Sequence, residues 1–418
     1  MLCQFVFENF KSFKSEAFLD FIAEPISDNA DSLIIDKIDS EKFLPVISIY
    51  GPNGGGKSTV LEALNYLRII IIQKVILSQA DGNEKDDDIS ELIKMASVSK
   101  VKEKYHKFDP KCKDYPTSFD ILFRVDDREY RYQISLIQDK ITEENLYMKF
   151  IGKEEGAIIF ERSDSDYNLG EILEGIAVEK LKNTMPLISH IAINYEIDII
   201  DKIVSWFLNI NIVDYDNPLK EKRILIPKTE ERKKQLFELL KTMDINISDF
   251  RLEKDIDGSI TGIFTKHMLP NGMIYEIPFE EESSGTRKLF SCLAEILNCL
   301  QNGGLMIADE LDAKLHPKLL KCIIQLFTNI CTNKKGAQLV LTSHDITTMN
   351  SNVYRRDEIW FCALNPENAS SLYSLIAFRK QNGKPPRSDE TYGKQYLEGR
   401  YGADPYIRRI LDWEDACE

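Results

Sequence analysis

The feature that most constrains the fold is a glycine-rich segment, GPNGGGKS, at residues 51–58. An apolar, β-branched run from Val46 to Tyr50 precedes it and a helical pattern follows Ser58, so the sequence predicts a strand, a loop and a helix. The segment fits the pattern GxxxxGK[ST], in which glycines let successive backbone N–H groups turn toward phosphate oxygens. The alternative is an ordinary glycine-rich turn, which the flanking strand and helix disfavour.

This loop provides the groups that a nucleotide needs. Lys57 can reach the β and γ phosphates, the Ser58 hydroxyl can bind Mg²⁺, and the backbone amides can hold phosphate oxygens. We therefore expect ATP and Mg²⁺ as cofactors. The expected nucleotide-binding residues of the loop are Asn53, Gly54, Gly56, Lys57, Ser58 and Thr59.

A second candidate element is the apolar strand Leu305 to Ala308, which ends in two carboxylates. Asp309 would hold Mg²⁺, usually through water, and Glu310 would polarise the attacking water. Acidic pairs at strand ends are common, so the pair alone decides nothing. Its surroundings favour the catalytic interpretation, because LDAKLHP follows at once and TSHD, at residues 342–345, follows a helix and a strand later.

A third element is ESSGT, at residues 282–286, before a helix whose apolar residues recur on one face. A serine and a glycine at a helix N-terminus can supply a hydroxyl, N–H groups and the helix dipole to a γ-phosphate. The alternative is an ordinary helix N-cap. The position just before the carboxylate strand favours phosphate binding by Ser283 and Gly285.

In this order, GPNGGGKS, ESSGT, LMIADELDAKLHP and TSHD resemble the Walker A, signature, Walker B with D-loop, and H-loop motifs of ABC-type ATPases. The opening NFKSF, Asn9–Phe13, resembles the start of the SMC and RecF-like branch. The ending, RDEIWFCALN…SSLYSLIAFRK…YLEGRYGADP, is similar to AAA-family ATPases of bacterial abortive-infection and phage-defence loci. Those proteins are relatives of the ATPase domain of overcoming-lysogenization-defect (OLD) proteins. The resemblance spans nearly the whole chain and thins between residues 150 and 240.

The resemblance implies an α/β fold, the ABC-ATPase P-loop fold with an antiparallel β side sheet and a mainly helical insertion. It also implies a homodimer or higher homo-oligomer in which ATP is sandwiched between subunits, with Ser283 and Gly285 acting in trans. Lys11 and Ser12 would line the site near the phosphates or the ribose.

The same resemblance assigns roles in hydrolysis. Lys57, Glu310 and His344 would be catalytic, with His344 sensing the γ-phosphate. Ser58 and Asp309 would bind Mg²⁺. Two features depart from the pattern: SSGT is not a full LSGGQ, and two glutamines, Gln133 and Gln138, are both candidates for the Q-loop.

The patterns divide the chain into three parts. We expect an N-terminal ATPase lobe at 1–150 with the Walker A loop and a β side sheet, a mainly helical insertion at 151–250, and a C-terminal ATPase lobe at 251–418 with the other motifs. In the first part, Phe119–Val125 and Tyr130–Ile137 alternate apolar and polar residues around an Asp-Asp pair, which predicts a hairpin.

The formal net charge of −15 argues against a protein that coats nucleic acid over its whole surface, so any such contact is expected in a local patch. One lysine-rich stretch is a candidate, with a solvated surface as the alternative. Its lysines are Lys100, Lys102, Lys104, Lys107, Lys111 and Lys113. No segment approaches the ~20 apolar residues that span a bilayer, and Glu8 and Lys11 interrupt any signal-peptide core. We expect a cytoplasmic protein without membrane contact.

The leading functional hypothesis is an ATP-hydrolysing sensor of an anti-phage defence system, triggered by DNA, RNA or a phage protein. The short stretch after His344 has little room for a nuclease domain, so we expect a separately encoded effector, a nuclease or toxin. One alternative is a RecF/SMC-like ATPase of DNA repair or recombination. A transporter nucleotide-binding subunit is a further alternative, which the NFKSF opening disfavours.

Overall fold

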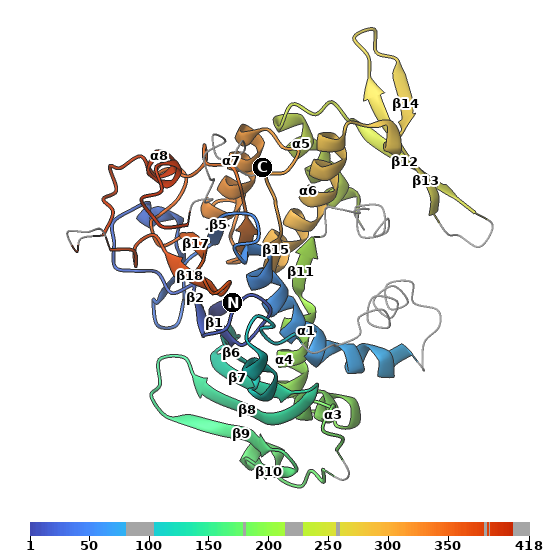
Figure 1. Cartoon of the computed structure of the whole chain (residues 1–418). Coiled ribbons are helices and arrows are strands. Elements are labelled where there is room, and N and C mark those ends of the chain that lie inside the picture. The colour runs from blue at the N-terminus through green and yellow to red at the C-terminus, as the bar shows by residue number, and fades with distance from the viewer. Residues whose placement is uncertain are drawn as a thin grey trace, which may run out of the picture.

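The computed structural model describes residues 1–80, 104–178, 181–213, 229–255, 260–379, 383 and 385–403. The fold is α/β, with a mixed central sheet and an antiparallel side sheet (Figure 1). A long helix, α1 (Lys57–Ala80), packs with residues of both large sheets in one hydrophobic core. The expected α/β fold with an antiparallel side sheet is confirmed.

The central sheet has the strand order β11-β15-β16-β5-β17-β18. Its strands are Ile210–Val213 (β11), Leu305–Ala308 (β15), Gln338–Thr342 (β16), Val46–Tyr50 (β5), Ile359–Leu364 (β17) and Ser370–Ser374 (β18). All neighbours pair in parallel except β17 with β18. Every residue of β5, β15 and β16 is buried, which is typical of parallel strands covered on both faces.

Successive residues of these strands enter two different cores, because side chains alternate across a sheet. In β5, Ile47 and Ile49 pack in the core that contains α1, α3 and α4, whereas Val46 and Tyr50 pack in the core that contains α6 and α7. These helices are Leu187–Asn194 (α3), Asp198–Leu208 (α4), Ser284–Asn302 (α6) and Pro317–Thr328 (α7). The central sheet is therefore a middle layer between helices (Figure 1).

The side sheet has the order β10-β9-β8-β7-β6-β1-β2 and is antiparallel throughout. Its strands are Asp166–Leu169 (β10), Gly156–Ser163 (β9), Lys140–Phe150 (β8), Arg128–Ile137 (β7), Thr117–Val125 (β6), Leu2–Glu8 (β1) and Ala17–Asp20 (β2). The predicted hairpin is confirmed as β6 and β7, and Asp126 in its turn has a φ of 55°, the left-handed conformation that tight turns use. The sheet packs on α1, where the rings of Phe119 and Tyr66 lie 5.8 Å apart.

The segment 151–250 is mixed, unlike the mainly helical insertion expected there. Beside α3, α4 and α5 (Glu230–Thr242) it contains β9, β10 and β11. The first two strands extend the side sheet and β11 pairs with β15 of the central sheet. Sheet edges offer unpaired N–H and C=O groups, so short runs gain ladder hydrogen bonds there that no helix periodicity reveals. Helix α5 begins directly after Thr229, whose side chain accepts a hydrogen bond from the Arg232 N–H and so caps the helix.

A three-stranded antiparallel sheet, which the sequence did not indicate, projects beside α5 and α6 (Figure 1). It consists of Asp249–Lys254 (β12), Ile260–Met268 (β13) and Ile274–Pro278 (β14). The part of the chain that the structure describes also contains two short strands, Ile34–Ile35 (β3) and Lys42–Phe43 (β4), and a short helix, Tyr392–Leu397 (α8). Four 3₁₀ helices lie at Ala30–Ser32, Pro110–Asp114, Glu171–Leu173 and Phe279–Glu281. Among the described residues, no helix has the length and apolar character needed to cross a membrane.

Candidate ATP site

Three loops meet at one edge of the central sheet. The register pairs Ile49 with Thr342, and Leu341 with Ala308, so the carboxyl ends of β5, β16 and β15 lie side by side. The Walker A loop, the TSHD turn and the Asp309 carboxylate follow these ends directly. Open α/β sheets bind ligands at this edge.

The Walker A loop needs glycine at two positions. Gly51 has a φ of 154°, and a Cβ there would overlap the carbonyl oxygen of Cys362 on β17. Gly56 has a φ of 106°, and a Cβ there would lie 2.6 Å from Ser370 Oγ. Side chains at either position would push the loop away from the sheet. Asn53 and Gly54 lie at the exposed tip, where their backbone is open to a ligand.

Lys57 begins α1 and is folded over its own loop. Its Nζ donates hydrogen bonds to the carbonyl oxygens of Gly51 at 3.0 Å and Pro52 at 3.2 Å. Burial lowers the pKa of Lys57, whereas the carboxylates of Glu310 and Asp309 act in the opposite direction. Phosphate oxygens are stronger acceptors than these carbonyls, so a bound nucleotide could take over the same ammonium.

Oxygen atoms suited to Mg²⁺ come from Ser58, in the first turn of α1, and from Asp309, at the end of β15. Mg²⁺ prefers hydroxyl, carboxylate and water oxygens, so this pair fits the ion. The Asp309 carboxylate is held from one side, because Oδ1 accepts a hydrogen bond from Thr342 Oγ1 at 2.5 Å. Thr59, the next residue of α1, is half-buried beside Ser58.

Thr342 also fixes the backbone of Glu310. The Glu310 N–H donates to Thr342 Oγ1 at 2.7 Å, and Glu310 has a φ of 45°. This left-handed conformation is uncommon for a residue with a side chain. It leaves the Glu310 carboxylate 60% exposed, with one oxygen 3.9 Å from Nε2 of His344. The His344 N–H donates to Asp312 Oδ2 at 3.1 Å, so the D-loop orients this histidine.

The signature segment starts helix α6. Ser283 is its N-cap, with Oγ accepting a hydrogen bond from the Thr286 N–H at 3.0 Å. Ser284 is the first helical residue and, like Ser283, is exposed. A Cβ on Gly285 would lie 2.9 Å from the Lys314 carbonyl oxygen, so the D-loop packs directly on the signature turn. The N-cap that the sequence offered as the alternative is therefore present, and Ser283 has this structural role whatever else it binds.

Lys11 and Ser12 lie in the turn between β1 and β2. Lys11 forms an ion pair with Glu62 of α1 and has a φ of 50°. Ser12 Oγ donates to Thr59 Oγ1 at 3.4 Å, directly after the Walker A loop. The turn therefore borders the start of α1, with Ser12 nearer to the Walker A residues than Lys11, whose charge is paired with a glutamate one turn further along the helix.

A family model described as "AAA domain, putative AbiEii toxin, Type IV TA system" matches residues 46–350. This stretch contains the Walker A loop, the signature turn, the paired carboxylates and the TSHD turn. The chain belongs to this family. No curated protein matches the chain.

Several solved structures are similar to this AbiEii-type AAA protein. An SMC head bound to the C-winged helix domain of ScpA matches 90% of this chain and 97% of that chain, at 15% identity and a TM-score of 0.46. The SMC head domain from Thermotoga maritima matches 90% of this chain and 98% of that chain, at 14% identity and a TM-score of 0.39. The ATP-binding cassette MJ0796, in a dimeric post-hydrolysis state bound to ADP and Pi, matches 90% of this chain and 100% of that chain, at 15% identity and a TM-score of 0.29.

Sequence reasoning missed two residues of this AbiEii-type AAA site. The role of the Thr342 hydroxyl depends on β16 lying next to β15, which no local pattern reveals. Lys288, on α6, donates from Nζ to the carbonyl oxygens of Glu310 and Ala313. The sequence does contain one sign of this burial. Lys288 precedes Cys292 by four residues, so both lie on the same face of the helix, where the neighbouring residues are apolar.

Neither candidate Q-loop glutamine bonds to the Walker A loop within the part of the chain that the structure describes. Gln133 lies on β7 and donates to Asp120 Oδ2 at 2.8 Å across the side sheet. Gln138 has a φ of 51° in the turn between β7 and β8, next to Asp139. The assignment of a Q-loop residue stays open between them.

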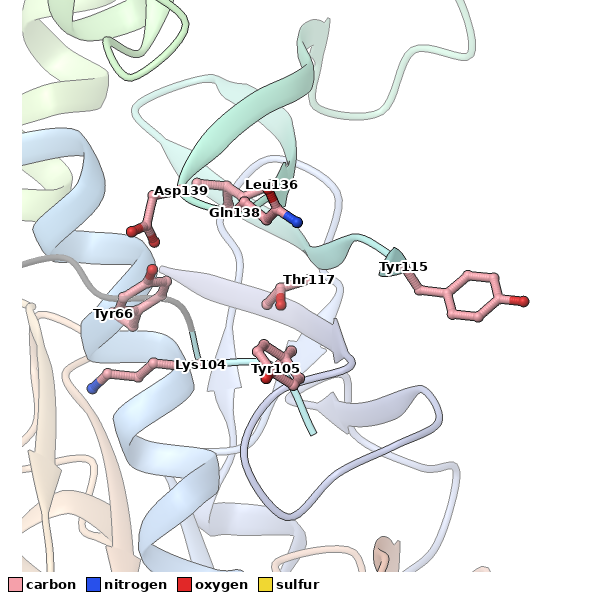
Figure 2. A pocket seen from close by; sticks show the side chains of 8 residues that line it. All are labelled: Tyr66, Lys104, Tyr105, Tyr115, Thr117, Leu136, Gln138 and Asp139. Carbon is pink, nitrogen blue, oxygen red and sulfur yellow. The ribbon is translucent and has the colours of Figure 1, made fainter. Parts of the chain in front are cut away.

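Residues 104–117, which we call the strap, cross the turn at Asn9 and Lys11. Lys104 belongs to a small pocket with Tyr66, Gln138 and Asp139 (Figure 2), and its Nζ lies 5.4 Å from the centre of the Tyr66 ring. Burial lowers the pKa of Lys104. The strap lysines that remain exposed are Lys107, Lys111 and Lys113. The predicted lysines Lys100 and Lys102 lie outside the described residues.

Proposed function

We propose that this AbiEii-type AAA protein hydrolyses ATP as a head-to-tail pair of copies. Each nucleotide would lie between the Walker A loop of one copy and the signature turn of the other. The observation that carries the proposal is the exposed pair of Glu310 and His344, 60% and 42% exposed beside the Walker A loop. A general base works best where bulk water is excluded, so this pair needs a cover.

The signature turn is a suitable cover. Ser283 and Ser284 are exposed at the N-terminus of α6, where N–H groups and the helix dipole favour a phosphate. Among the described residues, the Ser283 hydroxyl forms hydrogen bonds only with Thr286, in the first turn of its own helix. A second copy, turned by a two-fold axis, would bring this helix end to the first copy's γ-phosphate and would receive the same contact in return.

A mixing experiment tests the composite site. Ser283→Arg should place a bulky cation in the γ-phosphate seat of the partner, and Lys57→Ala should remove ATP binding, so each variant alone is inactive. An equal mixture should recover about a quarter of wild-type turnover, because half of the dimers are mixed and each has one intact site. Asn302→Arg, at the exposed far end of the same helix, is the matched control and should stay active. No recovery despite demonstrated subunit exchange would contradict the arrangement.

The wider role that we propose is a sensor ATPase of a bacterial anti-phage system, related to the ATPase domain of OLD proteins, that licenses a separately encoded nuclease or toxin. It is supported by the family description, which names a toxin–antitoxin system, and by the resemblance of the C-terminal segment. The trigger would be DNA, RNA or a phage protein. In cells carrying the complete locus, Lys57→Ala should restore phage plating, and equal plating with wild type and variant would contradict the role.

A RecF/SMC-like repair ATPase is the second candidate. The observation in its favour is the NFKSF turn, whose Ser12 bonds with Thr59 and whose Phe13 ring lies against Gly56 of the Walker A loop. A repair ATPase would respond to DNA ends or gaps without any effector. ATP turnover measured with and without gapped duplex DNA, in the absence of other proteins, distinguishes the two roles.

A further inference from the structure

Lys288 is a buried cation that connects the signature helix with the catalytic loop. It lies in the second turn of α6 and is 4% exposed. Its Nζ donates to the carbonyl oxygen of Glu310 at 2.7 Å and to that of Ala313 at 2.8 Å. Burying an ammonium group is costly unless hydrogen bonds compensate it. The backbone of the Walker B and D-loop segment provides that compensation.

The segment that Lys288 holds has an unusual backbone. Glu310 and Lys314 have φ values of 45° and 63°, and such conformations persist only where the surroundings fix them. Both backbone groups of Glu310 are held from other elements: Thr342 of β16 accepts from its N–H, and Lys288 of α6 donates to its C=O. Rotation of this residue, which would redirect its carboxylate, therefore breaks at least one of these bonds.

A second contact joins the same two parts. Gly285 packs on the D-loop so closely that an added Cβ would lie 2.9 Å from the Lys314 carbonyl oxygen. The signature turn and the loop after Glu310 therefore touch through a steric contact at Gly285 and through charge-assisted hydrogen bonds at Lys288. The signature turn and the Glu310 backbone are therefore joined by direct contacts.

We propose that Lys288 is a positioning residue for hydrolysis: by holding the Glu310 carbonyl it aims the Glu310 carboxylate of its own subunit. It thereby links that carboxylate to the seating of the signature turn on the partner's nucleotide. This inference rests on the proposed function. A lysine with a merely structural role would affect unfolding and leave turnover per bound ATP unchanged.

Lys288→Met keeps an unbranched chain and removes the donors. We expect unchanged ATP affinity by calorimetry and unchanged KM, with kcat reduced at least about tenfold, because small misplacements of catalytic groups are costly. Lys288→Arg keeps charge and donors and should recover part of kcat. Lys318→Met, at an exposed position of α7, is the matched control and should resemble wild type. A folded Lys288→Met protein with wild-type kcat overturns the proposal.

Mixed dimers decide whether Lys288 acts on its own Glu310. A mixture of Lys288→Met with Ser283→Arg should recover turnover. In the mixed dimer, one composite site takes its Walker A loop and an intact Glu310 from the Ser283→Arg subunit, and only its signature turn from the Lys288→Met subunit. Mixed with Lys57→Ala, it should not recover, because the remaining site uses the misaligned Glu310. The opposite pattern would assign Lys288 to the signature turn and overturn the proposal.

Two controls separate the possible failures. If Ser283→Arg with Lys57→Ala gives no recovery, the composite site is wrong, and the kcat of Lys288→Met alone still tests the positioning role. If Lys288→Met does not fold, Lys288→Arg carries the test. Its planar guanidinium cannot meet both carbonyls in the same geometry, so its kcat should fall at constant ATP affinity. A wild-type kcat for that variant contradicts the proposal.

Discussion

Thr342→Val tests whether one buried hydroxyl fixes both carboxylates of the site. Thr342 is fully buried at the end of β16. Its Oγ1 donates to Asp309 Oδ1 at 2.5 Å and accepts from the Glu310 N–H at 2.7 Å. Valine has nearly the same shape and the same preference for strands. The substitution therefore removes two hydrogen bonds and changes little else.

The magnitude follows from the two bonds. A hydrogen bond to a charged group contributes about 1.5–3 kcal/mol and a neutral one about 0.5–1.5 kcal/mol. Asp309 is only partly buried, so water replaces part of the first bond and the low ends apply. We expect the free energy of unfolding to fall by about 2 kcal/mol. If the same loss appears in the transition state, kcat falls about 30-fold, because 1.36 kcal/mol is a factor of ten in rate.

Urea unfolding and steady-state ATP turnover measure the two effects separately. Thr342→Ser is the matched control: it keeps the hydroxyl and loses one methyl group, so it should lose about 1 kcal/mol of stability and keep most of kcat. The reasoning fails if the valine variant turns over ATP as fast as the serine variant, or if both are equally inactive.

Four further outcomes are expected. Lys57→Ala should abolish ATP binding in calorimetry, because the loop then lacks its mobile cation. Glu310→Gln should bind ATP but hydrolyse it slowly, since an amide cannot act as a base, and should sediment as a dimer with ATP; wild-type turnover would refute its role. Changing the exposed strap lysines to Glu should abolish nucleic-acid binding at ~50 mM salt, where such contacts are strongest, and should leave ATP turnover unchanged. If the wild-type protein binds no nucleic acid under these conditions, a protein trigger is favoured. Burial raises the pKa of Glu358 from 4.5 to about 8. Between these two pH values the unfolded chain has lost the Glu358 proton and the folded chain keeps it, so the free energy of unfolding falls as pH rises. Glu358→Gln should remove this fall, which thermal unfolding at pH 5 and at pH 8 measures.

The parts of the fold that the sequence predicted are those in which local pattern and tertiary role agree. Leu305–Ala308 is an unbroken apolar run, and it is a fully buried parallel strand. The hairpin of β6 and β7 turns at the Asp-Asp pair that separates its two alternating runs. The Walker A loop could be placed because its glycines are required by local geometry, as the φ of 106° at Gly56 illustrates.

The parts that escaped prediction depend on partners far away in the sequence. Ile210–Val213 is a strand because β15, almost a hundred residues later, offers an edge. The role of Thr342 depends on Asp309 and Glu310 arriving beside it from another strand. Lys288 has the same character: a lysine on a helix is usually solvated, and only the folded D-loop supplies the carbonyls that make its burial tolerable.

The strap shows the same limit for charge. From sequence, Lys104 and the exposed strap lysines form one stretch, yet the fold separates them. Asn9 donates to the carbonyl oxygens of Cys112 and Tyr115, and the Lys11 N–H donates to the Lys104 carbonyl oxygen, which fixes the strap across the turn. Lys104 is thereby directed toward α1 while the other lysines face solvent. The same turn borders the start of α1, so a polyanion bound to the strap lysines would contact a segment that is hydrogen-bonded to the ATP site. Binding of the polyanion and turnover of ATP must therefore be measured in the same titration.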